Sequence, residues 1–220
     1  MSNILQIAYT TEGNTDERFL GNIIEKTFET LLYESETEIE IHSPVHVTES
    51  GESFKEKIKA ISLKYNYFHV LCVHCDSDSS TNETVLQNKV NPAFQLVDNT
   101  ENACKNLVAI IPVQMSEAWM LADIQLFLDE INTGRTCGEL DLPCKTRQVE
   151  ALANPKYQIE EALRKAQIGM PRRRSKLKIA DLYTPISQKM TIPKLEALPS
   201  FRAFKENARQ SLINLNYLHK

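Results

Sequence analysis

The sequence predicts an α/β protein with a mostly parallel central sheet flanked by helices and a mainly helical C-terminal part. Short apolar runs alternate with amphipathic helical segments over residues 1–132. Strands that are apolar along their whole length are typical of parallel sheets with helices on both faces, although one antiparallel edge strand stays open. We therefore expect an α/β core over 1–132 and a basic, mainly helical extension over 133–220 that packs on it.

The first elements are a buried strand and a long helix. "ILQIAY" (4–9) is short and apolar, and the turn-like "TTEGN" closes it. The following segment predicts a helix because its apolar residues recur at helical spacing. "EIEIHSPVHV" (38–47) alternates as a strand does, and residues 50–65 predict a helix with Ser50 as its N-cap.

The rest of the chain continues the alternation. We expect a strand at 67–74, a helix at 82–99, a strand at 106–114, a helix at 116–131 and a final helix at about 200–215. Pro92 should break the helix in which it lies, because proline lacks the N–H that an inner helical turn needs.

Composition limits the functional classes. The chain has 220 residues and a formal net charge of -4, so a role in nucleic-acid binding must depend on a local patch. Residues 145–178 supply one: ten basic side chains against three acidic ones give a local net charge of +7. The run "RRRSKLK" within it contains no acidic residue.

The five cysteines predict a reduced protein. Their number is odd and no secretory leader precedes them, so we expect no structural disulfide framework and a soluble, cytoplasmic protein. "CVHC" (72–75) lies inside a strand-like run, which argues against a redox or zinc motif. No apolar run approaches the length that spans a membrane.

Acidic side chains follow each of three apolar strands. In chain order these pairs are Glu12 and Asp16, Asp76 and Asp78, and Glu117 and Asp123. Mg²⁺ prefers hard oxygen ligands, and two-metal phosphoryl chemistry needs several carboxylates close together. Asp76 and Asp78 would leave the same face of the chain if it stays extended there.

Each pair also has a simpler explanation. Asn14 and Glu17 have the spacing of a helix cap with its returning partner. The segment 76–80 could be a loop of helix-capping residues, and an acid such as Glu117 is favourable near any helix N-terminus because of the helix dipole. His74 could orient a ligand or be an ordinary buried histidine. The coincidence favours a metal site, because carboxylates gathered at one sheet edge repel one another unless they share a cation.

Several common motifs are absent from the sequence. It contains no G-x-x-x-x-G-K-[ST] loop, no glycine-rich dinucleotide fingerprint and no G-x-S-x-G elbow. A P-loop nucleotidase, a dinucleotide-dependent enzyme and an α/β-hydrolase are therefore disfavoured.

The motifs "EGNTDERFL" and "VHCDSD" resemble the Toprim domain, which carries a glutamate after its first strand and an Asp-x-Asp after a later one. "IPVQMSEAWMLAD" (111–123) and "LPSFRAFKENARQSL" (198–212) resemble small stand-alone Toprim-like proteins of bacteria. These are related to the nucleases of the overcoming-lysogenization-defect family. The similar motifs are short but are distributed over most of the chain. The resemblance implies a Toprim-like fold.

The resemblance also implies roles for individual residues. Glu12 matches the Toprim glutamate, expected to act as general acid/base or to bind metal. Asp76 and Asp78 match the metal-binding Asp-x-Asp, and Asp16 matches an additional acid of the nuclease branch. Further matches are Glu117 and Asp123 as acids of less defined role, and Lys176 or Lys178 as the lysine that meets the scissile phosphate.

Together these features predict a Mg²⁺- or Mn²⁺-dependent nuclease that acts on DNA, with RNA as the alternative substrate. Backbone phosphates would contact Arg172, Arg173, Arg174, Lys176 and Lys178. Alternatively, the basic segment is a solvated helix face with pairs such as Glu160–Arg164. The resemblance implies antiphage defence or DNA maintenance with a separate ATPase subunit, and a homodimer stays open.

Two other functions stay open. One is a non-catalytic or partner-activated interaction module of a defence complex. The other is a phosphohydrolase for a small molecule, which would need an enclosed pocket and not an open basic groove.

Overall fold

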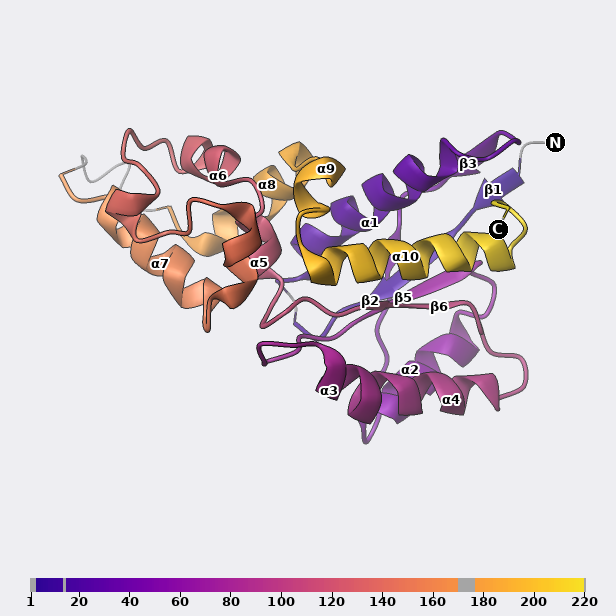
Figure 1. The fold of residues 1–220 in the computed structure, drawn as a ribbon. Coiled ribbons are helices and arrows are strands. Elements are labelled where there is room, and N and C mark those ends of the chain that lie inside the picture. The colour runs from indigo at the N-terminus through magenta and orange to yellow at the C-terminus, as the bar shows by residue number, and fades with distance from the viewer. Residues whose placement is uncertain (1–2, 14, 170–176, 220) are drawn as a thin grey trace.

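The computed structural model describes residues 3–13, 15–169 and 177–219 and confirms the predicted class. Its centre is a parallel sheet in the order β4-β2-β5-β6, and a two-stranded parallel ladder of β1 and β3 extends it (Figure 1). The strands are β1 (Asn3–Leu5), β2 (Ile7–Thr10), β3 (Ile39–Ile41), β4 (Val45–His46), β5 (Val70–His74) and β6 (Leu107–Ile110). Every pairing among the described strands is parallel, so the antiparallel edge that the sequence left open is not found there.

Two predicted strands are each split in two. The strand expected at 4–9 is interrupted at Gln6, whose N–H donates to Nδ1 of His69 at 3.0 Å. The strand expected at 38–47 is interrupted between β3 and β4. Pro44 lies in that gap, and proline cannot donate a ladder hydrogen bond.

Helices cover both faces of the sheet. In Figure 1, α1 and α10 lie on one face while α2 and α4 lie on the other. The bounds are α1 (Glu17–Leu32), α2 (Phe54–Lys64), α3 (Glu83–Val85), α4 (Asn91–Asp98), α5 (Glu117–Met120), α6 (Ile124–Glu130), α7 (Pro155–Ala166), α8 (Tyr183–Lys189), α9 (Ile192–Leu195) and α10 (Pro199–Asn214). Short 3-10 turns occupy Gly138–Leu140, Thr146–Ala151 and Ile179–Asp181.

The strand residues alternate between two apolar cores. Ile7 and Tyr9 of β2 join the core that contains α1 and α10, whereas Ala8 joins the core that contains α2 and α4. Val70 and Leu71 of β5 divide in the same way. This follows from the two-residue period of a strand and explains why both sides of each strand are apolar.

Three local expectations about helices are wrong. Ser53, and not Ser50, is the N-cap of α2, and its hydroxyl accepts from the N–H of Glu56 at 3.4 Å. Pro92 does not break its helix, because it lies in the first turn of α4, directly after a π-helical turn at Leu86–Val90. The helix expected at 116–131 is divided by residues 121–123 into α5 and α6.

Helix α1 approaches β2 closely at Gly21. A Cβ at this position would lie 2.9 Å from the hydroxyl oxygen of Tyr9, which donates to the Glu17 carbonyl. Burial, with the nearby charge of Glu17, raises the pKa of Tyr9 to about 12. The small residue therefore lets the helix and the buried phenol pack together.

We expect Gly21→Ala to lower the free energy of unfolding by about 1–3 kcal/mol, because the added methyl group overpacks this contact. The higher helix propensity of alanine offsets roughly 0.5–1 kcal/mol of that cost. Chemical denaturation would measure the change. Gly134→Ala is the matched control, since nothing lies within 4 Å of its Cβ position. Equal stability of the two variants would contradict the close packing.

The C-terminal part contributes to the same apolar core as the sheet. Helix α10 packs on β6 and α1, while α5 to α8 form a group beside the sheet edge (Figure 1). Lys26 of α1 fixes α8 by donating to the carbonyls of Ser187, Gln188 and Met190. The described helices of the C-terminal part thus share one apolar core with the sheet.

The prediction of reduced cysteines is wrong for one pair. Cys137 and Cys144 form a disulfide in the loop before α7. Cys72, Cys75 and Cys104 are free and buried. Counting cysteines could not find this bridge, because the odd total hides a single local pair.

Candidate metal centre at the sheet edge

The candidate site lies where the order of the strands reverses. After β2, the chain first adds β4 on one side of it and then β5 and β6 on the other. The loops after β2 and β5 therefore diverge at the carboxyl ends of the two central strands, which is where ligands bind in open α/β sheets. Asp16 follows β2, and His74 and Asp76 lie at the end of β5.

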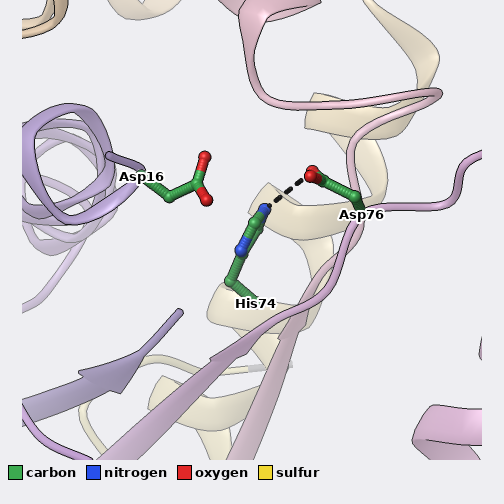
Figure 2. A group of neighbouring side chains, drawn as sticks. All are labelled: Asp16, His74 and Asp76. Carbon is green, nitrogen blue, oxygen red and sulfur yellow. Dashed lines mark hydrogen bonds and ion pairs between the residues drawn. The ribbon is translucent and has the colours of Figure 1, made fainter. Parts of the chain in front are cut away.

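Three side chains converge at this point. Asp16, His74 and Asp76 each present one ligand atom, and these atoms lie within 4.8 Å of one another (Figure 2). Asp16 and His74 are buried, with 5% and 1% of their surface exposed, while Asp76 is half-buried. The structure thus brings together two of the six acids that the sequence singled out, with the histidine between them.

Ser116 connects the two aspartates. Its N–H donates to Oδ1 of Asp76 at 3.2 Å, and its hydroxyl donates to Oδ1 of Asp16. The N–H of Gly13 donates to the other carboxylate oxygen of Asp16 at 3.2 Å. A Cβ on Gly13 would lie 2.8 Å from that same oxygen, so a larger residue would displace the carboxylate.

The hydrogen bonds of His74 indicate its tautomer. Nδ1 accepts from the N–H of Glu12 at 3.4 Å, which places the ring proton on Nε2, 3.1 Å from Oδ1 of Asp76. In this state His74 donates to Asp76 and orients it, as residues that hydrogen-bond to a metal ligand commonly do. Direct coordination through Nε2 would require the proton to move to the other nitrogen.

Glu117 adds a second buried carboxyl beside Asp16. Only 4% of its surface is exposed, and Oε1 accepts from the hydroxyl of Tyr183 at 2.5 Å. Burial raises the pKa of Glu117, and the charge of Asp16 adds to this shift while the Tyr183 hydroxyl opposes it. Two neighbouring buried acids favour a bound cation, because a cation removes their repulsion.

The donor set fits a hard divalent cation. Aspartate and glutamate oxygens are the ligands that Mg²⁺ and Mn²⁺ prefer, whereas thiolates select softer metals. Within the described part of the chain, Oδ2 of Asp76 receives no hydrogen bond from the protein, so it is open to a ligand. Asp16 and Asp76 would hold the ion directly, with Glu117 next to them.

Glu12 lies beside this group without joining it. Its carboxylate oxygens accept from Nζ of Lys89 at 3.0 and 3.2 Å, and its side chain is 45% exposed. Burial pushes the pKa of Glu12 upward, but the hydrogen bond and charge of Lys89 outweigh it and hold that pKa below its ordinary value. Glu12 is therefore an accessible, ionised carboxylate.

Asp78 and Asp123 do not belong to the cluster. The chain is not extended after β5, since Asp78 is exposed with a φ of 46°, so the shared face expected for Asp76 and Asp78 does not exist. Asp123 is the N-cap of α6, where it accepts from the N–H of Leu126 at 3.2 Å and lies 3.4 Å from Nζ of Lys194. Its role here is to begin a helix.

The helix cap expected at Asn14 and Glu17 is only partly described. Asn14 lies outside the described residues, and Asp16 occupies the N-cap position of α1. A carboxylate oxygen of Glu17 lies 3.4 Å from Nδ1 of His46 on the edge strand β4. Glu17 therefore points away from the metal cluster.

Most of the predicted nucleic-acid-binding residues lie outside the described residues, namely Arg172, Arg173, Arg174 and Lys176. Lys178 is described and exposed, and its backbone N–H donates to Asp181. Earlier in the basic segment, Arg164 pairs with Glu161, and Lys165 pairs with Asp141. Local pairing thus explains part of this charge, with partners that differ from the expected ones.

Neither Ser116 nor Tyr183 was predicted from the sequence to belong to the site. A serine that begins an apolar helix is indistinguishable from an ordinary cap, and Tyr183 lies 66 residues from its partner Glu117. The only sequence signal is the position of Ser116 directly after the third strand, beside Glu117. His74 had two explanations, and the structure combines them, since it is buried and also bonded to Asp76.

Comparisons with known proteins give no relative. No family model matches the chain, and neither the curated proteins nor the solved structures contain a match. The likeness to Toprim domains therefore stays a prediction. Among the described residues, no helix is both long enough and apolar enough to cross a membrane.

The raised pKa of Glu117 has a consequence for stability. Because the folded chain binds this proton more tightly than the unfolded chain, the stabilisation is complete below the ordinary pKa of about 4.5. It is lost as the pH rises through the raised value. We expect Glu117→Gln, which keeps an acceptor for Tyr183, to become progressively more stable than the wild type as the pH rises to neutrality.

Denaturation in EDTA at a series of pH values would measure this difference. Glu139→Gln is the control, because the pKa of that exposed acid is lowered by hydrogen bonds to Thr136. Its effect should have the opposite sign. If the difference in unfolding free energy between Glu117→Gln and the wild type stayed constant across the pH range, the pKa of Glu117 would not be raised in the folded protein.

Proposed function

We propose that this protein is a Mg²⁺- or Mn²⁺-dependent phosphodiesterase, and specifically a nuclease that cuts DNA. The observation that carries the proposal is the convergence of Asp16, His74 and Asp76 at the reversal point of the sheet. Glu117 supplies a further buried acid at the same place. Such a donor set suits phosphoryl chemistry, which needs little from the protein besides positioning and charge neutralisation.

Each residue of the site has a defined task. Asp16 and Asp76 would hold the cation, while Ser116 and His74 fix the two carboxylates by hydrogen bonds. A bound divalent ion lowers the pKa of water and neutralises charge on a phosphoryl group. Glu12 is ionised and partly exposed beside these residues, so it can accept a proton from the attacking water.

The choice of a nucleic acid as substrate rests on charge, and the choice of DNA rests on the resemblance. The net charge of +7 in residues 145–178 suits a phosphate backbone, and Lys178 is exposed within that segment. A separate ATPase subunit and a role in antiphage defence or DNA maintenance are part of the proposal through the Toprim likeness alone.

Incubation of the purified full chain with supercoiled plasmid and Mg²⁺, Mn²⁺ or EDTA tests the proposal. We expect nicked or linear plasmid with at least one of the two ions and intact plasmid in EDTA. A thermal shift should accompany metal binding, because an ion that binds only the folded chain stabilises it. Asp16→Asn should lose both effects.

The matched control is Asp98→Asn, an exposed aspartate at the end of α4. It should cut and bind metal as the wild type does. The absence of cutting together with the absence of a metal-induced shift would contradict the proposal. A metal-induced shift without cutting would favour a partner-activated module.

A further inference from the structure

A pocket opens directly beside the candidate metal centre. It has a volume of about 280 Å³ and lies between the first turn of α2, the π-helical turn and the ends of β2 and β5. Its lining includes Thr10, Glu12, Phe54, Lys57, His74 and Lys89. His74 belongs to both places, so a ligand in this pocket would be adjacent to an ion held by Asp76.

Thr10 brings an unused hydrogen-bonding group to this pocket. Its residue surface is 2% exposed, and its hydroxyl has no hydrogen-bond partner within the described residues. A buried hydroxyl without a partner is costly and uncommon in folded proteins. A ligand oxygen in the pocket would give this hydroxyl an acceptor.

Two lysines bring positive charge. Nζ of Lys89 is held by Glu12 and lies 4.9 Å from the centre of the Phe54 ring. Nζ of Lys57 donates to the Thr11 carbonyl at 3.3 Å. An ammonium has three N–H donors, so both lysines keep donors for a further oxygen ligand.

The backbone around Lys89 supports a dedicated role. Lys89 lies within the π-helical turn Leu86–Val90, and such turns occur frequently at functional sites because they redirect side chains. The first turn of α2 also faces the pocket through Phe54 and Lys57, which adds the positive end of a helix dipole. The charged lining therefore has two lysines against the single carboxylate of Glu12.

We propose that this pocket is a phosphate subsite in which Lys57, Lys89 and the Thr10 hydroxyl bind a phosphate group of the substrate next to the metal centre. Lys89 then takes the phosphate-binding task that the Toprim resemblance implied for Lys176 or Lys178. Its pair with Glu12 keeps the ammonium in place before the ligand arrives. The identification of the ligand as substrate rests on the proposed function, whereas phosphate binding itself does not require cutting.

The test measures binding in EDTA, without metal and without turnover. The full chain is titrated with inorganic phosphate and, separately, with a dinucleoside monophosphate, while amide NMR shifts report where each probe binds. We expect shifts at Thr10, Lys57 and Lys89. Lys89→Gln should weaken binding about tenfold, the effect of one charge-assisted hydrogen bond.

Lys55→Gln is the matched control, because Lys55 lies on the same helix as Lys57, is exposed and does not line the pocket. It should bind both probes as the wild type does. Tighter binding of the diester would identify an internal backbone phosphate, and tighter binding of inorganic phosphate would identify a terminal one. Equal affinities of Lys89→Gln and Lys55→Gln, or shifts confined to other regions, would overturn the subsite.

Thr10→Val separates binding from folding. Valine has the shape of threonine without the hydroxyl, so the melting temperature should be unchanged or higher, while phosphate binding weakens about fivefold. A structural role of Thr10 cannot produce both results. Phosphate binding is measured in EDTA, whereas plasmid cutting is measured with Mg²⁺ or Mn²⁺. Loss of cutting by Asp16→Asn together with normal phosphate binding would therefore show that the subsite binds phosphate independently of the metal centre.

Discussion

Asp76→Asn is expected to lower the rate of plasmid cutting by at least about 100-fold, because a metal ligand loses its charge. Asparagine keeps an oxygen that can accept from the Ser116 N–H, which donates to Oδ1 of Asp76 at 3.2 Å. The fold around the site should therefore persist. The affinity for Mn²⁺ should fall by a similar factor, and calorimetric titration would measure it.

Asp78→Asn is the decisive comparison. The sequence assigned Asp76 and Asp78 the same task, whereas the structure leaves Asp78 exposed in a left-handed conformation outside the cluster. Asparagine tolerates that conformation well, so the substitution removes only the charge. We expect at most a small loss of activity. Equal losses for the two variants would favour the Asp-x-Asp pair implied by the Toprim resemblance over the geometry of this structure.

The difference between these two aspartates shows how far a sequence can predict such a site. Asp16 and Asp76 were found because parallel strands end at one edge of a sheet, so an acid directly after each strand must lie near the others. The direction of a side chain after the strand depends on loop dihedral angles. Nothing in the pattern of strand ends predicts the φ of 46° at Asp78.

Contacts distant in sequence set the other limit. Lys89 lies 77 residues from Glu12, and Tyr183 lies 66 residues from Glu117, so neither pairing has a local pattern. Both depend on how helices far along the chain return to the sheet edge. The apolar pattern predicted the helical segment that carries Lys89, but no helix was predicted for α8, which carries Tyr183. Such patterns say which face of a helix is buried and not which polar side chains meet.

Element boundaries failed for similar physical reasons. The strand pattern at 4–9 continues through Gln6, but the backbone there pairs with His69 and shifts the ladder to a new neighbour. The helix pattern at 116–131 also continues, although Asp123 restarts the helix by capping α6. In each case one polar residue interrupts an apolar period, through a tertiary contact at Gln6 and through a local helix cap at Asp123.

Trp119→Ala should be the most destabilising single substitution considered, with a loss of about 3–5 kcal/mol in the free energy of unfolding. Trp119 is fully buried in α5, and its ring centre lies 5.3 Å from that of Phe201 and 6.1 Å from that of Phe204. Its indole N–H donates to the Ser200 hydroxyl at 2.8 Å, and that hydroxyl donates to Glu150. Truncation would leave a large cavity between α5 and α10.

Trp119→Phe isolates the hydrogen bond from the packing. It keeps most of the aromatic contact and removes the donor to Ser200, so a loss nearer about 1–3 kcal/mol is expected. Circular dichroism during denaturation is the suitable measurement, since Trp119 is the only tryptophan in the chain and both variants lack its fluorescence. Similar stabilities of the two variants would contradict a dominant packing role.

The same substitution links the core to the site. Ser116 and Glu117 lie three and two residues before Trp119, so the position of the Asp16–Asp76 connection depends on how firmly α5 is held against α10. We therefore expect Trp119→Phe, while still folded, to weaken Mn²⁺ binding more than Gly21→Ala does at equal loss of stability. Gly21 packs on the same apolar core through Tyr9, and the three atoms nearest to its Cβ position all belong to Tyr9. Equal metal affinity in the two variants would mean that the carboxylates are fixed by their own hydrogen bonds alone.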